Sequence, residues 1–440
     1  MILERLFHLK ENKTNIRTEV ISGITTFMTM SYIIFVQPAI LSKCGMDFGA
    51  VMVATCLASS VAIFCMGFLA NYPIALAPAM GHNFYFAFTV CLGLGIPWQI
   101  ALGANFISGV LFILLSFWGL REALVNCVPT SLKNAIAVGI GLLIAFIGLE
   151  WAGIVVKAPG TIVGLGELNN RCVLLSLLGI TIISILMCLK VKGAILIGII
   201  CSSILGLLFG MTKYHGIVDL PPSLKPTFLR LDILGVFSNL KTLITVIFVL
   251  WFLDVFDTVG TLIGIGEQAG FIDEKGNLPK AKQALLSDAV GTVGGTLLGT
   301  STITSYIESA AGVACGGKTG LANLVTGVLF LIALFFYPLV KMVATPYQEN
   351  FYPIIAPSLI IVGCLMMSNV RKIRWDDFSE SIPAFLTIVI MALSFSITEG
   401  IAFGFISYSL LKLISGKAND VHYLIYIFSG LFILRYLFLR

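Results

Sequence analysis

The chain has 440 residues, of which 58% are hydrophobic and 11% are charged, and its formal net charge is +5. A soluble domain carries about 25% charged residues, so the composition excludes an ordinary soluble protein and indicates one that crosses a lipid bilayer several times. The small net charge gives no reason to expect nucleic acid as a partner. The 10 cysteines show no metal-ligand spacing and mostly stand in apolar runs, so we expect neither a metal nor a cofactor.

The N-terminal residues 1–17 are basic and polar, lack the apolar stretch of a signal peptide, and are predicted to stay in the cytoplasm. After them, apolar runs that approach the roughly 20 residues needed to cross a bilayer follow one another, and we predict about fourteen spans. They are expected near 18–41, 48–70, 74–96, 98–120, 131–155, 172–189, 193–210, 243–266, 284–300, 302–316, 320–342, 351–368, 383–398 and 400–415. A further apolar segment, 421–439, is either interfacial or an additional span.

Two sets of seven spans predict an inverted repeat, because an odd number of spans turns the second copy upside down. We therefore expect a first repeat over 18–210, an external loop over 211–242, a second repeat over 243–416 and a C-terminal apolar segment over 417–440. The lysines and arginines of the connections favour a cytoplasmic N-terminus. The sequence thus predicts an all-α, multi-pass protein of the cell (inner) membrane.

The third span of the first repeat, 71–88, is interrupted by prolines. Pro73 and Pro78 precede His82, Asn83 and Phe84. Proline removes a backbone donor and breaks a helix, so the freed groups must line a cavity or meet a ligand. Asn83 offers both a donor and an acceptor, and Phe84 could stack on a planar ring. The alternatives are a proline kink without a ligand, a His82 that only bonds a neighbouring carbonyl, and core aromatics.

The second repeat carries acids inside apolar sequence: Asp254, Asp257, Asp288 and Glu308. A carboxylate at membrane depth is costly and marks a candidate functional site. Glu308 stands in a second interrupted segment, 299–312, and paired interruptions point to a midplane binding site. The plainer alternatives are a helix-terminal acid for Asp288 and a structural hydrogen-bonding acid for Glu308.

Asp254 and Asp257 are three residues apart and share a helix face. This spacing also fits a Mg²⁺-diphosphate site in a membrane enzyme. Such an enzyme would need a second acidic cluster and basic phosphate-binding residues, which the sequence does not show, so we do not expect an enzyme. No P-loop is present, and an ion gradient is therefore the expected energy source.

Long stretches of the chain resemble one transporter family. They include TNIRTEVISGITTFMTMSYIIFVQP, FLDVFDTVGTLIGIGEQAGF and TSYIESAAGVACGGKTGL. The sequence is similar to the nucleobase–cation symporter-2 class of the xanthine/uracil permease superfamily, in particular its azaguanine-resistance-type branch of guanine/hypoxanthine/adenine permeases. A uracil or xanthine permease of the sister branches would fit the architecture but not the FDTVGTLIG and SYIESAAG motifs.

The resemblance implies fourteen spans in two inverted repeats, divided into a core of spans 1–4 and 8–11 and a gate of spans 5–7 and 12–14. It implies short strands in interrupted spans 3 and 10, and homodimers. It also implies that Asn83, Asp257 and Glu308 contact the substrate and that Asp288 matters for transport. The family's sequence here is usually close to PGMGLNAYF, whereas this chain has PAMGHNFYF. Because Ala79, His82 and Phe84 depart from the family pattern, the resemblance leaves open which base the protein prefers.

We therefore predict a transporter that imports purine nucleobases together with protons. The Glu308 carboxylate can accept two parallel hydrogen bonds from guanine and one from hypoxanthine, while adenine would bind worse unless His82 compensates. Asp257 is expected to take up a proton outside and release it inside, with Asp288 as the other candidate proton carrier. A permease for xanthine or uracil is the alternative; an anion transporter of similar fold would need a basic residue at the helix breaks, and none is present.

Overall fold

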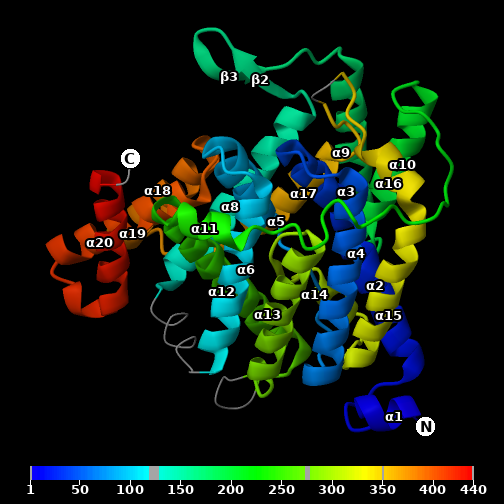
Figure 1. The fold of residues 1–440 in the computed structure, drawn as a ribbon, viewed down its shortest axis with the longest axis horizontal. Helices are drawn as coiled ribbons and strands as arrows, with labels where there is room; N and C mark the ends of the chain where they lie inside the picture. The colour runs from blue at the N-terminus through cyan, green and yellow to red at the C-terminus, as the bar shows by residue number, and fades with distance from the viewer. Residues whose placement is uncertain (1, 118–127, 273–277, 349–350, 439–440) are drawn as a thin grey trace.

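The computed structural model describes residues 2–117, 128–272, 278–348 and 351–438. Most of these residues are helical (Figure 1). Among them, seven helices are long and apolar enough to cross a membrane, and four shorter apolar helices accompany them. Figure 1 places the hairpin of β2 (Val155–Ala158) and β3 (Thr161–Leu165) and the helix α1 (Ile2–Phe7) at opposite ends of the molecule.

The elements follow the predicted spans closely. In the first half they are α1 (Ile2–Phe7), α2 (Ile16–Met30), α3 (Ile33–Leu41), α4 (Phe48–Cys65), the π-helix η2 (Met66–Ala70), β1 (Leu76–Pro78), α5 (Met80–Phe84), the π-helix η3 (Tyr85–Gly93), α6 (Trp98–Phe117), α8 (Thr130–Trp151), β2 (Val155–Ala158), β3 (Thr161–Leu165), α9 (Arg171–Cys188) and α10 (Ala194–Leu208). In the second half they are α11 (Ile233–Ser238), α12 (Leu240–Ala269), α13 (Ala281–Leu298), β4 (Ile303–Ser305), α14 (Ser309–Val313), α15 (Gly320–Ala333), α16 (Tyr337–Ala344), α17 (Ala356–Met366), α18 (Phe378–Leu393), α19 (Ile397–Ile414) and α20 (Tyr423–Phe438).

Two features were not anticipated, and the third belongs to the C-terminal apolar segment, which the sequence left as interfacial or an additional span. The first span is two helices, α2 and α3, with a break at Ser31 and Tyr32. The segment before α9 forms the β2–β3 hairpin. The C-terminal segment folds as α20, which lies beside α19 at one edge of the molecule (Figure 1), and Ser429 of α20 donates to the Phe405 carbonyl at 2.9 Å.

The short strands predicted in both interrupted spans are present and pair with each other. β1 and β4 are antiparallel, with Ala77 opposite Thr304. Beyond the strands, the Ala79 N–H donates to the Thr302 carbonyl and the Tyr306 N–H to the Ala75 carbonyl, both at 2.9 Å. The backbone groups freed by the two helix breaks thus satisfy one another, as irregular backbone inside a membrane protein must.

The helices pack in two groups. In one, α2, α4, α6, α13 and α15 contact each other around the strands; in the other, α8, α17, α18 and α19 do. They correspond to the expected core and gate. Glycines allow the close approach within each group. A Cβ on Gly23 of α2 would lie 2.4 Å from the Ala322 carbonyl oxygen, and one on Gly363 of α17 2.4 Å from the Gly141 carbonyl oxygen. The residue boundaries of the two repeats stay predictions.

Candidate functional site

Glu308 stands directly before α14, at the second helix break. Its side chain is half-buried and does not cap its own helix. Instead, the Tyr32 hydroxyl donates to Glu308 Oε1 at 2.7 Å. Within the described residues, no residue other than Tyr32 donates to this carboxylate from elsewhere in the chain, so Oε2 receives no hydrogen bond from another residue. One carboxylate oxygen is therefore held by the fold while the other is available to a ligand.

Asp257 lies in the middle of α12 and is exposed, although the helix belongs to the packed core. Thr304 of β4 donates to its Oδ2 at 3.2 Å. Gly260 and Gly264 follow on the same helix face and are also exposed, and a Cβ on Gly260 would meet nothing within 4 Å. This face of α12 is thus uncovered beside the second helix break.

The second break also links the two acids: Thr304, which donates to Asp257, stands four residues before Glu308, and α12 contacts α14. The structure therefore brings Glu308 and Asp257 together, whereas sequence spacing alone left them about fifty residues apart.

Salt bridges occur in the gate but not at this pair. Lys412 contacts Glu380 at 2.8 Å, and Arg435 contacts Glu399 at 2.8 Å. At the start of α18, Lys417 donates to Asp377 and holds the pKa of that carboxyl below its usual range. In the part of the chain that the structure describes, Glu308 and Asp257 have no ion pair with lysine or arginine. No basic side chain of the described residues therefore neutralises either acid.

The residues predicted from the first break are buried. Asn83 is 0% exposed, and its Oδ1 accepts a short hydrogen bond from the Ser301 hydroxyl, while its Nδ2 has no hydrogen-bond partner among the described residues. His82 places Nε2 3.3 Å from the Leu250 carbonyl of α12, which implies the tautomer with its hydrogen on Nε2. Phe84 stacks on Phe88 with ring centroids 5.8 Å apart. The first break contributes one free amide donor and packed rings.

Asp254 and Asp288 are fully buried in α12 and α13. Asp254 is three residues before Asp257, yet only Asp257 is exposed. The pair therefore does not present two carboxylates to one side, as a diphosphate-binding enzyme would require.

Sequence reasoning missed Tyr32, Thr304 and Tyr306. The Tyr306 hydroxyl donates to the Pro78 carbonyl at 2.5 Å and so ties the second break to the first. Thr304 and Tyr306 stand in the stretch TSYIESAAGVACGGKTGL, which was quoted for the family resemblance and not as a site. Tyr32 stands at the break between α2 and α3, in an apolar stretch with no local signal, and only the tertiary contact with Glu308 reveals it.

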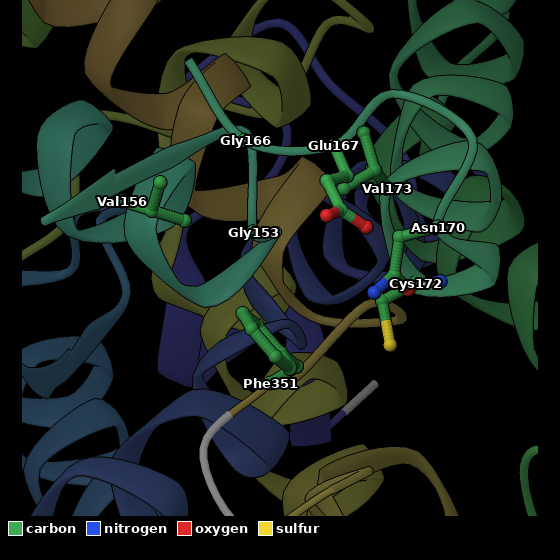
Figure 2. A pocket seen from close by; sticks show the side chains of 8 residues that line it. All are labelled: Gly153, Val156, Gly166, Glu167, Asn170, Cys172, Val173 and Phe351. Carbon is green, nitrogen blue, oxygen red and sulfur yellow. Dashed lines mark hydrogen bonds between the residues drawn. The ribbon is translucent and has the colours of Figure 1, made fainter. Parts of the chain in front are cut away.

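One surface cavity lies away from these residues. It measures about 180 Å³ and is lined by the β2–β3 hairpin, the start of α9 and Phe351, as Figure 2 shows. Its only carboxylate is the exposed Glu167, and the Asn170 oxygen in its wall already accepts from the Cys172 N–H to cap α9. None of the predicted site residues lines it.

Comparison with known proteins connects this geometry to transport. The chain is 45% identical over 438 residues to adenine permease AdeP of Escherichia coli K12, covering 100% of this chain and 96% of the relative. It is 43% identical over 450 residues to guanine/hypoxanthine permease PbuG of Bacillus subtilis 168, covering 100% of both chains.

Solved structures with the same fold include the transmembrane domain of the cyanobacterial bicarbonate transporter BicA. It matches with a TM-score of 0.66 at 17% identity, over 88% of this chain and 97% of that domain. The structure of SLC26A9 matches with a TM-score of 0.64 at 12% identity, over 92% of this chain and 67% of that one. These likenesses show the two-repeat architecture of core and gate.

The sequence profile described as "Permease family", that of the xanthine and uracil permeases, matches residues 17–403. A match of this extent shows a multi-pass membrane permease and excludes the alternative of a membrane enzyme. Together with its near-full-length relatives, it shows that this chain belongs to the xanthine/uracil permease family.

Proposed function

We propose that the protein imports purine nucleobases in symport with protons, and that the base lies between the second helix break and α12. The observation that carries the proposal is the pair Glu308 and Asp257. Each has one oxygen held by the fold, through Tyr32 and Thr304, and neither is neutralised by a lysine or arginine among the described residues. Such a pair suits a neutral ligand with N–H donors better than an anion.

The purine class follows from the donor pattern and from the relatives. A carboxylate accepts strong, charge-assisted hydrogen bonds from ring N–H and amino groups. Guanine offers two adjacent donors to Glu308, hypoxanthine one, and adenine a different edge. The relatives include an adenine permease and a guanine/hypoxanthine permease, so the class is a purine base. Asn83 Nδ2, which lacks a partner among the described residues, is the donor we assign to an acceptor atom of the base.

Proton coupling rests on the proximity of the two acids. Because two charged carboxylates repel, a proton taken up at Asp257 stabilises Glu308 as the charged carboxylate that accepts hydrogen bonds from the base. Release of that proton on the cytoplasmic side then weakens binding of the base. Asp288, fully buried in α13, is the alternative carrier. We extend the proposal to a homodimer, which cross-linking in native membranes would test.

The test is uptake of labelled guanine, hypoxanthine and adenine into proteoliposomes, with and without an inward proton gradient. We expect accumulation above the external concentration only with the gradient, and its collapse with a protonophore. Unlabelled guanine, hypoxanthine and adenine should compete, whereas uracil and xanthine should not. Accumulation without a gradient would refute symport, and competition by uracil or xanthine alone would assign the protein to a sister branch.

A further inference from the structure

A separate break, between α2 and α3, places one side chain at the site formed by Glu308 and Asp257. Tyr32 is 2% exposed, and its hydroxyl is 2.7 Å from Glu308 Oε1, across 276 residues of sequence. A glutamate at the start of a helix often turns toward the free N–H groups of its first turn. Glu308 makes no such cap, so Tyr32 is the group that fixes its direction.

The backbone around this contact is closely packed. A Cβ on Gly312 would lie 2.1 Å from Thr26 Oγ1, and one on Gly317 would lie 1.9 Å from Ser22 Oγ. Helix α2 is therefore in direct contact with α14 at Gly312 and with the segment after α14 at Gly317, positions where only glycine fits. Thr29, one turn further along α2, places Oγ1 3.3 Å from the Glu308 carbonyl oxygen. Close packing between α2 and the α14 region therefore sets the distance between Tyr32 and Glu308.

We propose that Tyr32 is a positioning residue of the substrate site, acting through Glu308. Its hydroxyl occupies one lone pair of Oε1, which orients the carboxylate and leaves Oε2 as the acceptor for a ring N–H of the base. This inference rests on the proposed function, in which Glu308 binds the base. A preorganised acceptor binds more tightly because the side chain loses less rotational freedom when the base arrives.

The test is the substitution Tyr32→Phe, which keeps the ring and removes the hydroxyl. Binding of labelled guanine and hypoxanthine to purified protein should weaken about tenfold, the typical effect of one hydrogen bond to a charged group. Tyr408→Phe is the matched control. Tyr408 is 3% exposed and donates to Glu380 at 3.3 Å in the gate, so the same change is made to a tyrosine–glutamate contact outside the site, and base affinity should stay within about twofold of wild type.

Repeating Tyr32→Phe in a second variant separates a positioning role of Tyr32 from a general role in packing. In Glu308→Gln protein the acceptor is a neutral amide, so removal of the Tyr32 hydroxyl should cost about twofold instead of about tenfold. Equal losses in both backgrounds, or wild-type affinity of Tyr32→Phe, would overturn the inference while the proposed function stands. If Glu308→Gln alone binds bases like the wild type, the proposed function fails first, and this inference with it.

Discussion

The two interrupted spans share one backbone design and differ in chemistry. Both run from a short strand into a short helix, and β1 and β4 pair directly. The first break presents His82, Asn83 and Phe84, all buried to 2% exposure or less. The second presents Glu308, half-buried, beside the exposed Asp257 of α12.

This difference shows what an inverted repeat does and does not determine. The repeat requires that both breaks satisfy their backbone groups, and each does so mainly through the other. It places no demand on side chains, so one break can supply structural contacts while the other supplies charge. We expect substitutions at the second break to affect binding and coupling strongly, and those at the first to have smaller effects.

The largest expected effect belongs to Glu308→Gln. Glutamine replaces an acceptor oxygen with an NH₂ donor, which faces a donor on the base and costs on the order of 2–4 kcal/mol of binding, or a factor of roughly 30 to 1,000 in affinity. Equilibrium binding of labelled guanine measures the loss. Glu267→Gln, an exposed position on the same helix as Asp257, is the control. Normal guanine binding by the Glu308 variant would exclude Glu308 from the site.

The next largest effect is expected for Asp257→Asn, and it should be limited to proton coupling. The amide oxygen of Asp257→Asn can still accept from Thr304 but cannot titrate, so exchange of labelled for unlabelled base should persist while gradient-driven accumulation fails. Both are measured in the same proteoliposomes. Asp376→Asn, at an exposed position before α18, should change neither. If Asp257→Asn protein still concentrates base, the proton is carried elsewhere, and Asp288→Asn becomes the decisive variant.

At the first break, Asn83→Ala should weaken base binding about tenfold through loss of the Nδ2 donor. Ser301→Ala provides the matched comparison, because it removes the same internal hydrogen bond to Asn83 Oδ1 and leaves the donor in place. We expect it to weaken binding by less than about threefold. Equal losses in the two variants would mean that Asn83 only supports the fold.

The smallest expected effect is that of His82→Leu, which restores the residue usual in the resembled family. It removes one neutral contact, Nε2 to the Leu250 carbonyl, worth about 1 kcal/mol. Because this contact joins the first break to α12, it should shift the order in which guanine, hypoxanthine, adenine and xanthine compete more than it changes the maximal rate. An unchanged competition profile would identify His82 as purely structural.

The sequence by itself determined the membrane class, most of the span positions and the two helix breaks. These follow from local properties: apolar runs of bilayer length, prolines that cannot continue a helix, and acids that are costly in hydrocarbon. The long motifs around Asp257 and Glu308 also sufficed to indicate the permease family before any fold was known.

Only the tertiary structure decided how the acids are used. Asp254 and Asp257 look equivalent in sequence, but packing buries the first and leaves the second exposed on the uncovered face of α12. Tyr32 carries no local signal at all, since its role depends on a carboxylate 276 residues away. Burial and long-range hydrogen bonds arise from helix packing, which neither periodicity nor spacing along one chain encodes.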